Sequence, residues 1–212
     1  MKYYLIVFFI LMLNNFQLSA QISEPKETNS EDMLKFAISE FDGKRYANCL
    51  NFLNMAITIN HNGELSDILY YYRALTYLKL EQENKALCDL DTAIVFNDQK
   101  IHYREIRLEL NMRSIKFNDA LTDIERILHS NPDNEIALLN KGIILQERGE
   151  IQNALNLYAK ILTIYSQNRE ARYLRGMIYL QNAMADKGCQ DIQLSASLGY
   201  KPAMDALSRY CR

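Results

Sequence analysis

The feature that most constrains the fold of this chain is a small residue that recurs at a fixed interval. Ala86, Ala120 and Ala154 are spaced 34 apart twice over, and each opens a similar segment with apolar residues at helical spacing. The helical segments before them carry a small residue followed three positions later by a large one: Ala74 and Tyr77, Gly142 and Leu145, Gly176 and Tyr179. Because one helix pair of this kind cannot bury its own apolar face, the period predicts a stack of helix pairs.

The remaining sequence also favours an all-α fold. Apolar spacing is helical almost throughout residues 31–212, and no alternating run rich in Val and Ile suggests a strand. The chain has only 7 glycines and 3 prolines in 212 residues, so few positions interrupt a helix.

Residues 30–198 resemble the tetratricopeptide repeat (TPR) family, with in-phase units at about 30–63, 67–100, 101–134, 135–168 and 169–198. The unit at 135–168 carries the family's signature positions best: Leu138, Gly142, Leu145, Gly149, Ala154, Tyr158, Ile161 and Leu162. The resemblance implies a right-handed solenoid of about five helix-turn-helix repeats within a TPR domain at 31–212. Residues 201–212 would form a C-terminal capping helix.

The third unit departs from this pattern. Its first helix carries apolar residues at Tyr103, Ile106 and Leu110, about one position out of register. Arg104 and Arg107 fall where apolar residues are expected. The sequence therefore predicts a helix there without fixing its faces.

The resemblance also implies a concave surface formed by the first helix of each repeat, where a protein or peptide partner would bind. By position, the expected partner-binding residues are Leu34, Ile38, Phe41, Ile68, Tyr71, Leu75, Leu78, Leu139, Ile143, Tyr173 and Met177, with Ile136 and Leu180 on the same face. The third unit would add His102, Glu105, Glu109, Met112 and Arg113. Such an apolar groove suits an amphipathic helix or an extended apolar peptide. The alternative is that a tight superhelix buries these side chains between neighbouring helices.

The N-terminus has the layout of a secretory signal. Lys2 precedes an uninterrupted apolar run at 3–13, and Ala20 suits signal peptidase cleavage. Because a membrane span needs about 20 apolar residues, an uncleaved anchor is the weaker alternative. We therefore expect a signal peptide at 1–20, a flexible linker at 21–30, and an exported protein that is periplasmic or secreted. The ending at 18–21 resembles the signal-peptide ends common in Bacteroidetes, so the resemblance as a whole is to an exported TPR protein of the Bacteroidetes type.

Charge and motifs exclude several function classes. Lys and Arg total 24 against 26 Asp and Glu, and no basic run suggests nucleic-acid binding. No catalytic, cofactor or metal motif occurs, and the pairs Asp89/Asp91 and Asp119/Asp123 are expected on solvated outer helix faces. We expect a non-catalytic scaffold without cofactor or metal and without stable membrane insertion after signal cleavage. Its oligomeric state is left open. The alternatives are a periplasmic chaperone or assembly factor and, less favoured, an accessory enzyme of cell-wall or carbohydrate processing.

The C-terminal cysteines predict a disulfide that joins two neighbouring helices. Cys189 and Cys211 lie nearly symmetrically about a break between Gly199 and Pro202, and antiparallel helices of equal length would bring them level. The ending also resembles cysteine-bearing caps of other exported TPR proteins. Two buried free thiols are the alternative. Cys49 and Cys88 are expected to stay unpaired, Cys49 packed in its repeat and Cys88 facing outward.

Overall fold

The computed structural model describes residues 29–60 and 63–211 of the protein. The expected signal peptide and nearly all of the expected linker lie outside these residues. The first helices of five pairs are α2 (Ser30–Asp42), α4 (Ser66–Lys79), α6 (Ile101–Arg113), α8 (Glu135–Glu147) and α10 (Arg169–Gln181). The second helices are α3 (Tyr46–Ile59), α5 (Glu83–Phe96), α7 (Phe117–Ser130), α9 (Ile151–Ile164) and α11 (Ala185–Ser197), and α12 (Lys201–Tyr210) ends the array.

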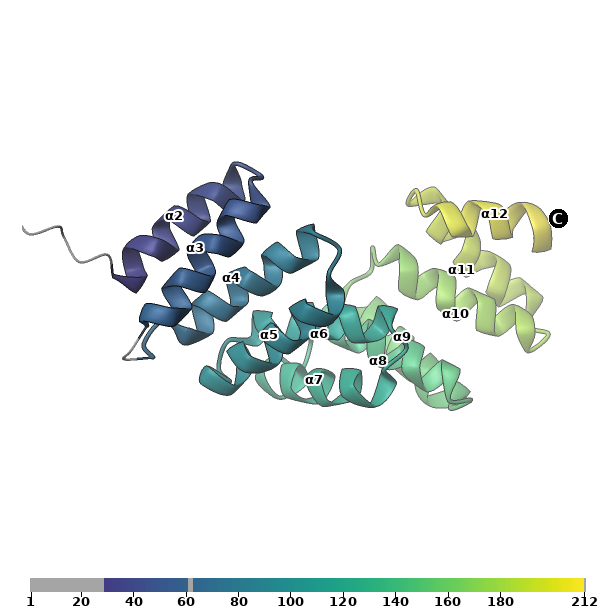
Figure 1. Ribbon diagram of the computed structural model, residues 1–212. Helices are drawn as coiled ribbons and strands as arrows, with labels where there is room; N and C mark the ends of the chain where they lie inside the picture. The colour runs from purple at the N-terminus through teal and green to yellow at the C-terminus, as the bar shows by residue number, and fades with distance from the viewer. Residues whose placement is uncertain (1–28, 61–62, 212) are drawn as a thin grey trace, which may run out of the picture.

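The helices form a curved row in which each packs against the next along the chain. The α2–α3 end and the α12 end rise on the same side of the middle units (Figure 1). The described residues contain no strand, and the predicted all-α solenoid is confirmed. Within the part of the chain that the structure describes, no helix combines the length and apolar character needed to span a bilayer.

The small residues of the repeat lie where paired helices approach most closely. Ala86, Ala120 and Ala154 are fully buried. A Cβ added at Gly142 would come within 2.5 Å of the Tyr158 ring on α9. The repeat period therefore reflects the spacing of helix contacts, because larger side chains at these positions would push the two helices apart.

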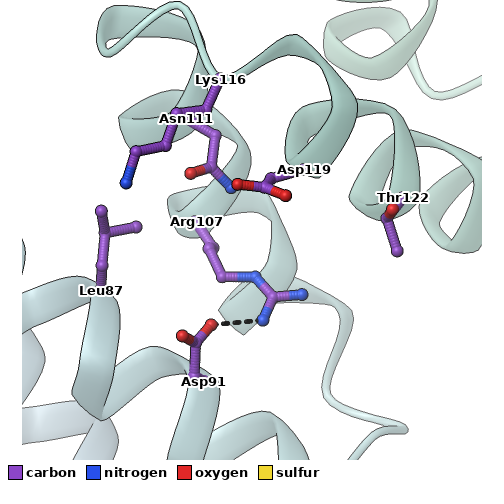
Figure 2. A pocket seen from close by; sticks show the side chains of 7 residues that line it. All are labelled: Leu87, Asp91, Arg107, Asn111, Lys116, Asp119 and Thr122. Atoms are coloured by element: carbon purple, nitrogen blue, oxygen red, sulfur yellow. Dashed lines mark hydrogen bonds and ion pairs between the residues drawn. The ribbon is translucent and has the colours of Figure 1, made fainter.

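The third unit reverses the small-then-large order. Leu108 is fully buried at the position one repeat period after Ala74, and Asn111 takes the position that Tyr77 holds in the second unit. A shorter polar side chain at 111 fills less of the gap between helices. A polar hollow of about 260 Å³ lies beside it, lined by Leu87, Asp91, Arg107, Asn111, Lys116, Asp119 and Thr122 (Figure 2).

Buried ion pairs join the two helices of three units. The Arg73 Nε lies 2.7 Å from Asp89, and Arg175 pairs with Asp191 at 2.7 Å. In the third unit, the Arg107 guanidinium donates two hydrogen bonds to Asp123, at 2.6 and 2.9 Å. Each arginine precedes its aspartate by 16 residues.

These pairs correct the expectation that both acidic pairs are solvated. Asp123 is fully buried and Asp89 is 5% exposed. Asp91 and Asp119 are exposed as predicted. A carboxylate can be buried here because an arginine from the preceding helix supplies charge and hydrogen bonds.

The last helix is stapled to α11. Cys189 and Cys211 form a disulfide with their Cα atoms 5.4 Å apart, which confirms the predicted pairing. Gly199 has a φ of +79°, and Pro202 lies in the first turn of α12. Gly199 therefore follows the end of one helix and Pro202 lies at the start of the next, as expected.

The other two cysteines are free, also as predicted. Cys88 is exposed, whereas Cys49 is fully buried, with its Sγ 3.2 Å from the Thr76 hydroxyl. Burial raises the pKa of the Cys49 thiol, so this cysteine is held as an unreactive thiol.

Candidate partner-binding site

A hollow of about 450 Å³ lies between the first helices of the third and fourth units, and we call it the α6–α8 hollow. Its lining residues are His102, Glu105, Ile106, Glu109, Met112, Arg113, Ile136 and Asn140. Five of them are the residues that position in the third unit assigns to the partner face. The structure thus brings those five to one place, and α8 contributes the other side.

One part of the α6–α8 hollow is apolar. Ile136 stands 56% exposed on α8, and Met112 is half-buried on α6. Complete burial of a side chain such as Ile136 contributes about 1.5–3 kcal/mol, so covering this surface would favour association. The flexible Met112 side chain can adapt its shape to what it meets.

Two carboxylates lie beside this apolar part, one helical turn apart on α6. The Asn134 side-chain amide donates a 3.0 Å hydrogen bond to Glu105, while its oxygen accepts from the Ala137 backbone N–H and caps α8. Glu105 is therefore tied to the start of α8. Glu109 is exposed, and among residues 29–60 and 63–211 no side chain forms an ion pair or hydrogen bond with it.

The positively charged arginine among the lining residues already forms an ion pair. Arg113 lies 3.1 Å from Glu83 of α5, and both side chains are largely exposed. The lining thus holds two carboxylates and one guanidinium, and the guanidinium shares its charge with a third carboxylate.

Aromatic rings border the other end of the α6–α8 hollow. The Tyr71 ring packs edge-on against His102, with centroids 5.0 Å apart, and lies 4.8 Å from Tyr103. The Tyr103 hydroxyl donates to Asp67 at 3.1 Å. Burial is the main cause that raises the pKa of Tyr103 and lowers that of His102. The lowered pKa favours the neutral form of His102 at pH 7, so this end adds little positive charge.

The other expected partner-binding residues divide into two groups. Leu34 is 7% exposed and packs in the core with Met33 and Leu53, so its assignment to the partner surface is wrong. It lies on the side of α2 that meets α3 and α4. The rest are half-buried and keep part of their surface open: Ile38, Phe41, Ile68, Tyr71, Leu75, Leu78, Leu139, Ile143, Tyr173 and Met177. Their role in binding stays a prediction.

Sequence reasoning missed Asn134 and Asn140. Asn134 did carry a signal in the sequence, because Asn168 follows it by one repeat period. Each asparagine caps a first helix and donates to a glutamate of the first helix before it, although the two glutamates occupy different positions of their helices. Asn168 caps α10 through Ala171 and donates to Glu135 at 2.7 Å. The described residues contain no group of three His, Cys, Asp or Glu side chains placed to hold a metal ion.

No protein-family model matches the chain. A TPR repeat-containing protein of Methanocaldococcus jannaschii is 24% identical over 137 residues, 65% of this chain and 24% of that protein. Rat serine/threonine-protein phosphatase 5 is 32% identical over 109 residues, 51% of this chain and 21% of the phosphatase. The chain thus spans between 21% and 29% of the length of the curated relatives it matches.

Solved structures share the fold at low sequence identity. The crystal structure of YrrB, a TPR protein with an unusual peptide-binding site, has a TM-score of 0.71 at 18% identity, covering 90% of this chain and 97% of YrrB. MamA from Desulfovibrio magneticus RS-1 has a TM-score of 0.70 at 9% identity, covering 80% and 94%. The repeat period, the helix pairs and these similarities together show that the chain has the fold of tetratricopeptide repeat proteins.

Proposed function

We propose that this chain is a non-catalytic scaffold that binds a protein or peptide segment on its first-helix face, at the α6–α8 hollow. The carrying observation is that this hollow combines exposed apolar surface at Ile136 with a carboxylate, Glu109, that no described side chain satisfies. Exposed apolar surface rimmed by polar groups is typical of a partner site. The likeness to YrrB supports the proposal, because YrrB is a TPR protein with a peptide-binding site.

The location of the scaffold is part of the proposal. The signal-like N-terminus favours export to the periplasm or the exterior. We expect mass spectrometry of the mature protein to find Gln21 as its first residue. Recovery of only full-length chain from the cytoplasm would contradict export without touching the proposed site.

Affinity isolation from envelope extract tests the binding role. Ile136→Asp places a charge on the apolar part of the α6–α8 hollow, and the matched control Ile164→Asp changes an isoleucine that is 43% exposed at the end of α9. Both variants should stay folded, which circular dichroism checks. We expect partner capture to fall at least tenfold for Ile136→Asp and to persist for Ile164→Asp.

The number of captured proteins separates the scaffold from its closest alternative. One partner in stoichiometric amount supports the scaffold, whereas many weakly held clients support a chaperone or assembly factor. Undiminished capture by folded Ile136→Asp protein would show that the partner binds elsewhere.

A further inference from the structure

We infer that the segment bound in the α6–α8 hollow carries a lysine or arginine next to a large apolar side chain, with the cation between Glu105 and Glu109. This inference rests on the proposed function and names the chemistry of the partner. It predicts an ionic-strength dependence that a purely apolar ligand would lack.

The charge of the lining is unbalanced. Glu105 and Glu109 lie four positions apart on α6, where like charges destabilise a helix. Arg113, the cation of the lining, is engaged by Glu83 at 3.1 Å. A cation from a partner would relieve the repulsion that the chain itself leaves in place.

One of the two carboxylates, that of Glu105, is held in position. Asn134 fixes Glu105 through a 3.0 Å hydrogen bond while capping α8, so Glu105 loses little freedom when a partner arrives. A carboxylate that already accepts one neutral hydrogen bond has further lone pairs for an ammonium or guanidinium. Charge-assisted bonds of this kind are stronger than neutral ones.

Apolar side chains lie at the same place as the two carboxylates. Ile136 and Met112 line the hollow that the two carboxylates also line. A lysine or arginine has an apolar stem behind its charge, and a neighbouring Leu, Met or Phe would cover the rest of this surface. Neither a polyanionic nor a purely polar segment would fit both parts of the lining.

Peptide selection tests the inference on the purified full-length protein. Phage displaying random dodecapeptides are selected against the native protein, the Glu105→Gln/Glu109→Gln variant and the control Glu125→Gln. Glu125 is an exposed glutamate of α7, outside the α6–α8 hollow. We expect native and Glu125→Gln protein to select peptides with a basic residue beside an apolar one, and the double variant to lose the basic preference.

Binding measurements give the size of the effect. For a synthetic copy of the most enriched peptide, Glu109→Gln should weaken binding about tenfold, and Glu125→Gln less than about twofold. Raising NaCl from about 50 to about 300 mM should weaken native binding several-fold and leave Glu105→Gln/Glu109→Gln binding nearly unchanged.

Two outcomes would overturn the inference in distinguishable ways. In the first, the selected peptides show no enrichment in basic residues and yet fail to bind the folded Ile136→Asp variant. That outcome would refute the charged ligand and keep the proposed site. Selection of no peptide above background by the folded native protein would refute both.

Discussion

On one side of α6, Arg104 and Arg107 reach the buried carboxylate of Asp123, while on the opposite side Glu105 and Glu109 line the open α6–α8 hollow. The four residues lie within six positions of one helix, but only the arginines find opposite charges within the described chain. Arg107 also pairs with Asp91 of the preceding unit at 2.6 Å.

The comparison separates charges that hold the fold from charges left for a partner. Arginine pairs buried between helices cannot be broken without leaving an unpaired charge out of water. The repulsion between two glutamates on one helix face lowers the stability of the helix. A helix that keeps such glutamates beside exposed apolar surface has the features expected of a binding face.

The largest expected effect on stability comes from removing the buried carboxylate that pairs with the two arginines of α6. Asp123→Ala should lower the free energy of unfolding by about 3–5 kcal/mol, because Arg104 and Arg107 then remain partly buried without their carboxylate. Urea unfolding followed by circular dichroism measures the loss. The control Asp119→Ala changes an exposed aspartate of the same helix and should cost less than about 0.5 kcal/mol. Equal effects of the two variants would show that Asp123 is not a structural charge.

A second internal constraint lies at the end of the array. Cys211→Ser removes the disulfide across a separation of 22 residues and should cost about 3 kcal/mol in the chain-entropy model. The loss should be confined to α12, since repeat arrays unfold in local units. Hydrogen exchange should therefore quicken in α12 while α4–α9 keep their protection, as should also happen on reduction. Uniformly faster exchange along the chain would contradict a local cap.

The smallest expected effect is an increase in the free energy of unfolding, whereas the other two variants lower it. Glu105→Gln/Glu109→Gln should raise the free energy of unfolding by about 0.3 kcal/mol, since it removes a like-charge pair while the amide oxygen introduced at position 105 can still accept from Asn134. Paired urea titrations compare the midpoints of the native and variant proteins. A lower midpoint for the variant would place these glutamates among the structural charges and remove the basis of the comparison.

The parts of this account that the sequence predicted depend on local spacing. The evenly spaced alanines predicted the helix pairs because small residues are required wherever two helices approach closely. The Cys189–Cys211 pairing followed from helix lengths on either side of one break. Both patterns depend on spacing along the sequence and need no knowledge of which helices contact one another.

The missed features depend on contacts between helices. Asp123 looked solvated because its burial needs Arg107, which reaches it from the preceding helix. Leu34 looked available because nothing local shows that α2 turns this residue into the core. The open charge of Glu109 likewise emerges only once Arg113 is seen to pair with Glu83 across two helices.

A charge exchange tests the central claim most directly. Isothermal titration calorimetry would compare native and Glu109→Lys protein with the selected basic peptide and with the same peptide carrying glutamate in place of its basic residue. We expect each single exchange to weaken binding at least tenfold and the double exchange to restore most of it, because the two charges meet in the complex. If the double exchange binds no better than either single one, the carboxylate of Glu109 does not contact the partner's cation, and the account of the α6–α8 hollow is contradicted.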